Sequence, residues 1–190
     1  MPLDAAAKKY LFTPLKLSAT GYLPAGGNIA FTTADTLTGE PLIGLSSDEN
    51  TRFLHGVSGA AGLFTTADDC RRYLSMLAQG GRLDGQCFLT SEAVHLFTAD
   101  HTRSLKEAWG LGVFLAGRGG LFPGDLWPKG SFGLTGQTGC TFAVDPKSGI
   151  HAALLCNRVH MSHEGQAFRR LCTLLFTGLY AQASRLESQG

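Results

Sequence analysis

Ser58 is one of the few side chains in this sequence whose neighbours suggest catalysis. It lies in the tetrapeptide Gly-Val-Ser-Gly, which is similar to a nucleophile elbow, where a serine sits on a sharp turn between a strand and a helix. In such an elbow the second glycine lies two residues after the serine. Here it follows Ser58 directly, and no strand is predicted before it. We therefore interpret Ser58 as a loop serine.

The cysteines offer a second kind of nucleophile. Cys140 and His151 are near each other in the sequence and could form a thiol–imidazole pair, but nothing beyond that proximity supports the pair. The five cysteines are an odd number and lack paired metal-type spacings. We predict free, buried thiols in a reducing compartment, and we interpret His151 as a core or edge histidine of a strand. The cysteines are Cys70, Cys87, Cys140, Cys156 and Cys172.

Two further pairs of polar residues have spacings that chemistry could use. His160 and His163 lie three residues apart, a spacing found in metal sites, but no cysteine or carboxylate cluster completes a set of ligands. Asp48 and Glu49 could act as an acid and a base. We interpret the histidines as residues of a loop that enters a helix and the carboxylates as part of a solvated loop, so no metal site is predicted.

The composition describes a globular chain. Of 190 residues, 44% are hydrophobic and 16% are charged, which excludes a disordered protein and allows a sizeable core. The net charge is +1 and the basic residues are scattered, so we expect no nucleic acid or anionic membrane partner. No apolar run is long enough to span a bilayer. The first ten residues do not resemble a signal peptide, so the chain as it stands is expected in the cytoplasm, with the compartment of any longer precursor left open.

The first half of the sequence predicts helices separated by loops. Residues 3–12 favour a short helix with Asp4 as its N-cap, ended by Pro14, and residues 25–50 favour a loop with short strands. A clear helix begins at Thr65 or Thr66 and stops at the glycine pair 80–81, and another follows Thr90 through about residue 97. The apolar face of the clear helix consists of Cys70, Tyr73, Leu74, Leu77 and Ala78.

The second half predicts a sheet and a closing helix. Residues 109–115 alternate as in a strand, and residues 141–144 and 150–156 flank a turn at 145–149 that suits an antiparallel hairpin. Trp109 is expected in the core and Trp127 at the rim of a cleft. Residues from 185 onward are expected to fray. The closing helix spans residues 164–182, with Phe168, Leu171, Leu175 and Leu179 on one face.

Four blocks of the sequence, in order, resemble one family. They are residues 3–23, the Ser-Asp-Glu-Asn stretch 47–50, the glycine-rich run 56–69 and residues 131–139 with the hairpin and helix that follow. Together they are similar to the C-terminal half of the penicillin-recognising serine hydrolases: class C β-lactamases, D-Ala-D-Ala peptidases, other penicillin-binding proteins and related esterases. Four blocks in the family's order cover nearly the whole chain, which argues against chance.

The resemblance implies a place for the substrate. In the family, a strand carries Lys-Thr-Gly or His-Thr-Gly, and the backbone N–H just past this motif supplies half of the oxyanion hole. The matching positions here are Leu134, Thr135 and Gly136, which are therefore the expected substrate-binding residues. Gln137 is the expected catalytic residue, through its backbone N–H. Leu134 lacks the family's charge, and Ala60 stands where one branch has a histidine.

The family's nucleophile is missing from this sequence. Neither Ser-x-x-Lys nor Tyr-x-Asn or Ser-x-Asn occurs anywhere in it. The resemblance therefore implies a serine hydrolase acting on β-lactam, ester or D-Ala peptide carbonyls that is inactive without a further segment. The alternative is a non-catalytic module, a pseudoenzyme remnant that binds a ligand near Thr135. A truncated reading frame with no function of its own is a third interpretation.

The implied fold is α+β, part of a β-lactamase/transpeptidase-like fold, with antiparallel strands packed by helices and part of a helical lobe. Residues 1–190 are expected to form a single incomplete domain, in which 3–100 give the lobe and 109–182 give three sheet strands and the closing helix. Strand 150–156 would keep an open apolar edge, so we expect marginal stability and either an N-terminal partner segment or self-association through that edge. No metal or organic cofactor is implied.

Overall fold

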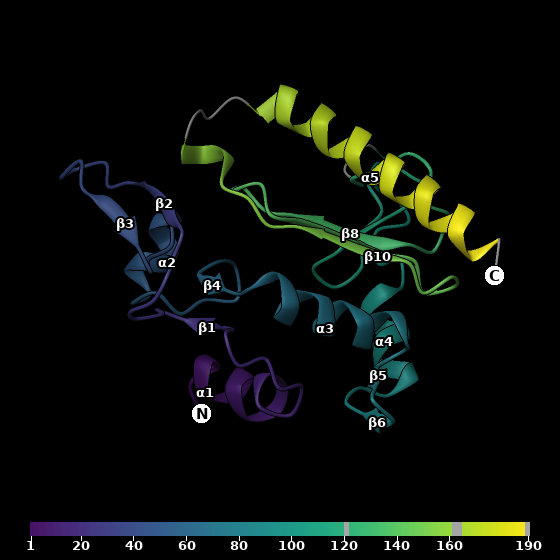
Figure 1. Cartoon of the computed structure of the whole chain (residues 1–190), viewed down its shortest axis with the longest axis horizontal. Coiled ribbons are helices and arrows are strands. Elements are labelled where there is room, and N and C mark those ends of the chain that lie inside the picture. Colours follow the sequence, from purple (N-terminus) through teal and green to yellow (C-terminus); the bar gives the residue numbers. More distant parts are fainter. Residues whose placement is uncertain (120–121, 161–164, 189–190) are drawn as a thin grey trace.

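The computed structural model describes residues 1–119, 122–160 and 165–188 and is an α+β arrangement (Figure 1). The helices are α1 Leu3–Ala7, α2 Glu49–Phe53, α3 Ala67–Ala78, α4 Ser91–Thr98 and α5 Gly165–Glu187, with a π-helical turn at Lys8–Phe12 and a 3-10 turn at Arg158–His160. The strands are β1 Gly21–Tyr22, β2 Phe31–Ala34, β3 Pro41–Ile43, β4 Leu63–Phe64, β5 Arg82–Leu83, β6 Gln86–Cys87, β7 Phe114–Leu115, β8 Phe132–Thr135, β9 Thr141–Val144 and β10 His151–Leu154.

The central element is an antiparallel sheet in the order β10-β9-β8-β7. α3 and α5 lie on opposite sides of this sheet (Figure 1). The predicted hairpin is confirmed, because β9 and β10 pair with His151 opposite Val144 and Leu154 opposite Thr141. The sheet has four strands rather than the expected three, and β10 is an edge strand as predicted. Three two-stranded pairs accompany it: β1 with β4, β2 with β3, and β5 with β6.

The strand predicted over residues 109–115 is largely wrong. Only Phe114 and Leu115 form β7, and the preceding residues make a tight loop in which the Gly110 N–H donates to the Val113 carbonyl at 2.9 Å. A side chain at Gly110 would lie 2.4 Å from the Phe97 carbonyl, and Gly112 has a φ of +77°. The glycines therefore serve a close approach and a turn, which alternation with apolar residues does not reveal.

The main core is built by α3 as the sequence predicts. Thr66 is its N-cap, Leu74, Leu77 and Ala78 are buried, and Cys70 and Tyr73 pack against the same cluster. That cluster continues into the sheet and the N-terminal loop. Its largest fully buried members are Leu15, Leu74, Met76, Leu77, Val113, Phe132 and Val144. α4 also follows its prediction, since the Thr90 hydroxyl accepts a hydrogen bond from the Ala93 N–H.

α5 covers the other side of the sheet through a smaller core. Phe176 is fully buried against Trp127 and Ala143, and the Trp127 indole donates a hydrogen bond to the Phe176 carbonyl at 3.0 Å. Trp127 is only 5% exposed, so its expected place at a cleft rim is wrong. The helix also continues to Glu187, past the predicted end at 182, so the predicted fraying is wrong for residues 185–187, while residues 189–190 lie outside the described residues.

The apolar face predicted for the closing helix is not the buried one. Leu171, Leu175 and Leu179 are 58%, 38% and 43% exposed, whereas Cys172 and Phe176 are buried. Phe168, the fourth residue of the predicted face, is half-buried and lies beside Gly139 of the β8–β9 turn, so the prediction is wrong for the leucines alone. Residue 164, the predicted start of this helix, lies outside the described residues.

The N-terminal segment is attached to α3 by a buried carboxylate. Asp69 accepts hydrogen bonds from the Ala19 N–H and the Thr20 hydroxyl, both at 2.8 Å. Residues 3–12 are helical as predicted, although the second half is π-helical. Asp4 is not the N-cap, because Pro2 holds that position without a side-chain bond. Within the described ranges, no helix is long and apolar enough to cross a membrane.

Candidate functional site

The turn between β8 and β9 presents a backbone donor to solvent. The Gly136 N–H donates to the Cys140 carbonyl at 2.7 Å, and the Gly139 N–H donates to the Gly136 carbonyl at 3.0 Å. These two bonds close the turn and leave Gln137 exposed beyond them. Among the residues that the structure describes, none accepts a hydrogen bond from the Gln137 N–H. An exposed, unpaired N–H on a closed turn can donate to a ligand oxygen without any rearrangement.

Leu134 and Thr135 are the last two residues of β8 and lead directly into this turn. They pair with Phe142 and Thr141, and both are half-buried. The Thr135 hydroxyl makes no hydrogen bond within the described part of the chain, so it can donate to or accept from a ligand. Leu134 has no charge to offer. The predicted site residues thus lie together at one end of the sheet, and their roles stay predictions.

The turn is held from behind by the chain that follows β10. The Arg158 N–H donates to the Thr138 carbonyl at 2.9 Å. The Asn157 side-chain amide donates to the carbonyls of Phe31 and Thr32, the latter at 2.6 Å, which attaches β2 to the same end of the sheet. Asn157 was not among the predicted site residues. Its signal was a single amide side chain directly after the apolar run 152–156.

α3 begins beside the same turn. Burial raises the pKa of the Cys70 thiol, and the nearby Cys140 raises it further. Cys70 lies in the first turn of α3 and Cys140 directly precedes β9, and α3 packs against β9 and β10. The glycine-rich run 56–69 leads into α3, so two blocks that are far apart in the sequence converge at this end of the sheet.

The glycine-rich run forms a compact loop. The Tyr22 hydroxyl donates to the Ser58 carbonyl at 3.1 Å, and the Ser58 hydroxyl accepts from the Ala60 N–H at 3.1 Å. Gly62 has a φ of +98°, and a side chain there would lie 2.9 Å from the Gly56 carbonyl. Ser58 is therefore a loop serine, as predicted, whose hydroxyl caps its own turn. Ala60 is exposed and adds no polar group.

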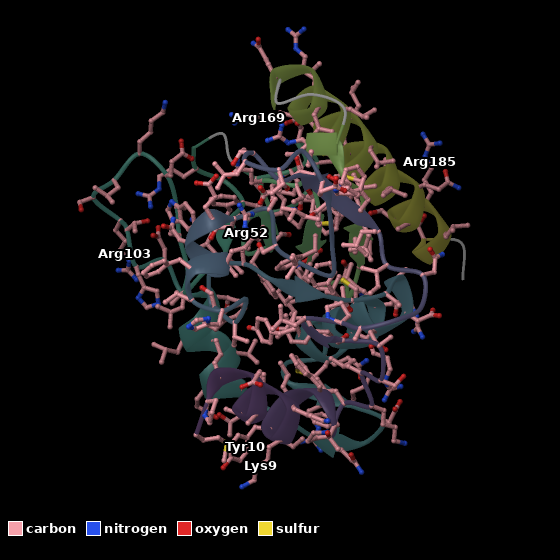
Figure 2. The ribbon with its side chains drawn as sticks, turned by 90° about the vertical axis from the view of Figure 1, so that its left-hand side faces the viewer. Lys9, Tyr10, Arg52, Arg103, Arg169 and Arg185 are labelled. Atoms are coloured by element: carbon pink, nitrogen blue, oxygen red, sulfur yellow. The ribbon has the colours of Figure 1, made fainter. Side chains whose placement is uncertain are left out.

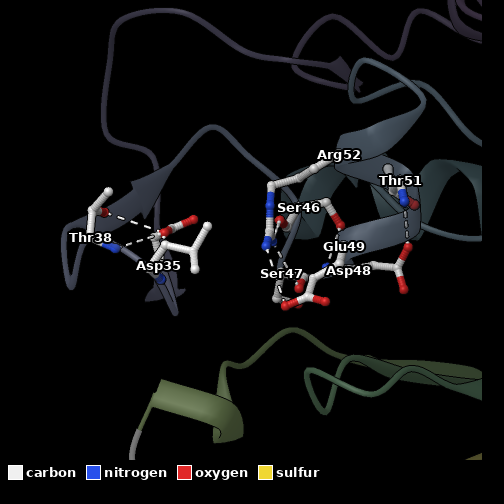
Figure 3. Close-up of polar contacts among 9 residues, drawn as sticks. Asp35, Thr38, Ser46, Ser47, Asp48, Glu49, Thr51 and Arg52 are labelled. Atoms are coloured by element: carbon white, nitrogen blue, oxygen red, sulfur yellow. Dashed lines mark hydrogen bonds and ion pairs between the residues drawn. The ribbon is translucent and has the colours of Figure 1, made fainter.

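The acidic residues Asp48 and Glu49 form the start of helix α2 (Figure 3). Asp48 is the N-cap of α2 and accepts from the Thr51 N–H at 2.7 Å, and hydrogen bonding by Thr51 lowers the pKa of this carboxyl. The Arg52 guanidinium donates to the carbonyls of Ser46 and Ser47. The prediction of a plain loop is wrong, since Glu49 opens the helix, and the two carboxylates do not form an acid–base pair.

His151 has a partner that the sequence did not suggest. Its Nδ1 lies 2.8 Å from the Gly149 carbonyl, to which it can only donate, and its Nε2 lies 3.0 Å from the Ser75 hydroxyl in a second hydrogen bond. Ser75 lies inside α3, so its own N–H belongs to the helix and is not free to serve as an oxyanion donor. The pair joins α3 to β10 rather than forming a hydrolase site. Cys140 does not contact His151 through a hydrogen bond, since its thiol donates to the Cys156 carbonyl.

The predictions for the cysteines and for the histidine pair have different outcomes. All five cysteines are free thiols, but only Cys172 is buried and Cys87 is exposed, so the expectation that all are buried is wrong. The His160 side chain and all of His163 lie outside the described residues. In the part of the chain that is described, no group of three or more His, Cys, Asp or Glu residues could hold a metal ion.

Comparison with known proteins identifies relatives over most of the chain. Residues 1–174 match the β-lactamase family. The chain is 28% identical over 179 residues to a "Putative D-alanyl-D-alanine carboxypeptidase" of Escherichia coli K12, and 29% identical over 180 residues to the protein of the same description in Salmonella typhi. Both alignments cover 84% of this chain and 41% of the relative, so the chain spans less than half the length of these relatives.

Solved structures share the fold. A penicillin-binding protein homologue from Caulobacter crescentus aligns with a TM-score of 0.59 at 21% identity, over 91% of this chain and 52% of that one. A mutant simvastatin synthase from Aspergillus terreus aligns with a TM-score of 0.65 at 18% identity, over 96% of this chain and 50% of that one. EstCE1, a hydrolase with promiscuous acyltransferase activity, gives 0.58 at 20% identity. The described fold therefore corresponds to about half of each.

Proposed function

Because the chain belongs to the β-lactamase family and spans a partial domain of it, we propose that it supplies one wall of a serine hydrolase site. In this proposal the chain is the C-terminal portion, which contributes the oxyanion donor and the substrate strand, and a further segment contributes the nucleophile and its base. The substrate is a β-lactam, an ester or a D-Ala peptide, whose carbonyl oxygen becomes negatively charged in the transition state.

The observation that carries the proposal is the unpaired Gln137 N–H on the turn after β8. A donor held by the two turn bonds needs no reorganisation when charge develops on a carbonyl oxygen, which is the condition for oxyanion stabilisation. Thr135 supports it with a hydroxyl on the strand that leads into the turn. Because the donor is backbone, the loss of a charged residue at Leu134 does not remove it.

Neither serine considered as a nucleophile in this chain fits the role. The Ser58 hydroxyl accepts from the Ala60 N–H and has no base beside it within the described residues. Ser75 has His151 beside it but lies inside α3, where the helix uses its N–H. Acyl transfer needs a nucleophile, a base and an oxyanion donor at one place. The described chain offers only the donor, so the proposed activity depends on a further segment.

The first test looks for that segment. The genomic DNA upstream of Met1 is sequenced, and its reading frames are searched for Ser-x-x-Lys followed by Tyr-x-Asn. When such a segment is found, the joined protein is assayed with a chromogenic β-lactam, a p-nitrophenyl ester and a D-Ala-D-Ala peptide. We expect turnover of at least one of them. A nearby segment whose joined protein turns over none of them contradicts the proposal.

Two substitutions then test the oxyanion donor. Gln137→Pro removes the N–H, and we expect kcat to fall by roughly 10²- to 10³-fold, as for loss of one oxyanion donor. Gln137→Ala is the matched control, because it changes the side chain and keeps the N–H, so its kcat should stay near wild type. Equal losses in the two variants would assign the effect to the side chain or to the fold of the turn.

A second candidate function rests on Leu134 and Ala60. These two residues stand where the family carries a cation and, in one branch, a histidine, so the site has lost polar groups. On this proposal the chain is a non-catalytic module that binds a small acyl compound near Thr135. NMR titration of the chain alone with a D-Ala-D-Ala peptide would then shift the amide signals of residues 135–138. Unchanged signals at saturating peptide would rule out this candidate.

A further inference from the structure

The outer side of α5 and the open edge of β10, together called the α5–β10 face, are both uncovered within the described chain. Phe176 of α5 packs in a cluster with Ala152 and Leu154 of β10, so the helix lies over the edge of the sheet. Its outward side carries leucines at helical spacing that contact no core. They are Leu171, Leu174, Leu175 and Leu179, which are 58%, 73%, 38% and 43% exposed.

The edge of β10 adds unpaired backbone groups to this face. The Asp145 N–H donates to the Ile150 carbonyl at 2.8 Å. This bond fixes which residues of β10 direct their backbone groups toward β9 and which direct them away. In an antiparallel ladder every second residue then turns its N–H and C=O away from the partner strand. For β10 these residues are His151, Ala153 and the following Leu155. Within the described ranges, no strand pairs with them, and such an edge is a template for another strand.

The chain exposes more solvent-accessible surface than a compact folded monomer of the same mass. Its accessible surface is 11,700 Å², whereas a folded monomer of 20.2 kDa exposes roughly 8,800 Å². The chain therefore exposes about a third more surface than expected. A standard interface buries about 800 Å² on each partner. The excess is thus ample for a stable interface, and the α5–β10 face combines apolar side chains with unpaired backbone groups.

We propose that the α5–β10 face binds a second copy of this chain in an isologous dimer. A two-fold axis through Ala153 pairs this residue with its own copy and sets His151 opposite Leu155 of the second copy. Two antiparallel edge strands satisfy each other in this way, and the two four-stranded sheets become one. The same axis places the two α5 helices side by side and antiparallel, with Leu175 near the axis and the leucine stripes in contact.

Charges and side chains permit this pairing. Arg169 and Arg185 lie toward opposite ends of α5 (Figure 2). With Leu175 at the axis, Arg169 lies opposite Ala181 of the second copy, so these arginines do not face each other. The His151 ring is held by Ser75 and Gly149, on the α3 side of the sheet, and does not block the edge. This inference stands independently of the proposed hydrolase activity.

The test is sedimentation equilibrium of the purified chain and three variants. Ala153→Pro removes an outward N–H but leaves the ladder with β9 intact, as proline does on an edge strand. Leu175→Glu places a charge in the leucine stripe. Leu105→Glu is the matched control, since Leu105 is also an exposed leucine, at 60%, but belongs to the loop after α4 and to neither α5 nor β10. Circular dichroism checks that each variant folds.

We expect the wild-type chain and Leu105→Glu to sediment at twice the monomer mass of 20.2 kDa. Leu175→Glu and Ala153→Pro should raise the dimer dissociation constant at least about tenfold, as loss of a central contact does. If Ala153→Pro does not fold, the dissociation constant of Leu175→Glu alone decides whether the dimer uses this face. A monomeric wild type, a dimer insensitive to Leu175→Glu, or polydisperse aggregates overturn the proposal. So does a monomer that binds only a complementary family segment encoded nearby, which would then be the occupant of this face.

Discussion

α3 and α5 have similar spacing of apolar residues but differ in whether those residues are buried. On α3, the residues that the spacing selects are the buried ones, and Leu74 and Leu77 are each 1% exposed. On α5, the spacing selects Phe168, Leu171, Leu175 and Leu179, of which the three leucines are exposed and Phe168 is half-buried. The helices lie on the two sides of one sheet (Figure 1). The pattern identifies an apolar stripe in both cases, but the leucines of the α5 stripe belong to neither core cluster of the described residues.

The difference shows what an amphipathic pattern can establish. A stripe marks the face that is stabilised by burial, and it does not identify the element that covers it. α3 finds its cover in the sheet and the N-terminal loop. α5 rests on the sheet through Cys172, Phe176 and Tyr180, and its longer leucine stripe remains outside. A chain that spans about half of its relatives is expected to keep such faces.

The largest expected effect compares one leucine from each helix. Leu77→Ala on α3 removes a buried side chain and leaves a cavity, so we expect the free energy of unfolding to fall by about 2–5 kcal/mol. Leu174→Ala on α5 removes a side chain that is 73% exposed, and we expect a change within about 0.5 kcal/mol in the monomer. Urea unfolding at low protein concentration measures both. Equal losses would show that α5 is covered and would remove the contrast.

A smaller effect is expected where α5 is anchored to the hairpin. The Tyr180 hydroxyl donates to Asp145 Oδ2 at 2.8 Å, and Asp145 is buried. Burial acts to raise the pKa of Asp145, but hydrogen bonds from Ser148, the Lys147 N–H and Tyr180 outweigh it and hold the pKa below its ordinary 3.8. Tyr180→Phe should therefore cost about 1.5–3 kcal/mol at pH 7, as for a bond to a charged group.

The acid dependence of this anchor has a definite sign. A carboxyl whose pKa is lowered in the folded state stabilises the protein above its unfolded pKa, and that stability is lost as the pH falls through the folded value. Wild type should therefore lose stability below pH 3.8, and Tyr180→Phe should lose less over the same range. Unfolding curves of the two proteins at pH 7 and in acid measure this, and parallel losses would exclude Asp145 as the titrating group.

The smallest expected effect concerns the start of α3. The Thr66 hydroxyl accepts from the Asp69 N–H at a long 3.4 Å, so Thr66→Ala should cost only about 0.5–1 kcal/mol. Thr66→Ser is the control, because it keeps the cap. A loss larger than that of Tyr180→Phe would mean that the end of α3 near the candidate site contributes more than the anchor of α5.

Much of the fold could be predicted from local signals, and the errors have identifiable causes. The two helix starts and the hairpin were correctly predicted, because each depends on a local signal. These signals are the N-cap hydroxyls of Thr66 and Thr90 and the turn residues 145–149. The loop at 109–113 was missed because Gly110 is set by an approach of the distant Phe97 carbonyl. Trp127 was misplaced because its burial depends on Phe176, some fifty residues away.

The candidate site follows the same division. Thr135 to Gln137 could be selected from a motif, since the strand and turn that present them are local. The contributions of Asn157 to β2 and of Ser75 to His151 join segments far apart in the sequence, and no spacing within one segment indicates them. The proposed reaction depends on groups that the described residues do not bring to the turn, so the motif predicts one wall of a site and leaves its chemistry to be tested.

The central proposal is that this chain supplies the oxyanion donor of a serine hydrolase site and that a further segment supplies the nucleophile. The most direct measurement is the intact mass of the folded chain after incubation with a fluorophosphonate probe, which phosphonylates activated serines with loss of fluoride. The account predicts that the chain keeps its unmodified mass of 20.2 kDa. A single adduct, mapped to Ser58 or Ser75 and lost when the chain is unfolded before labelling, would contradict it.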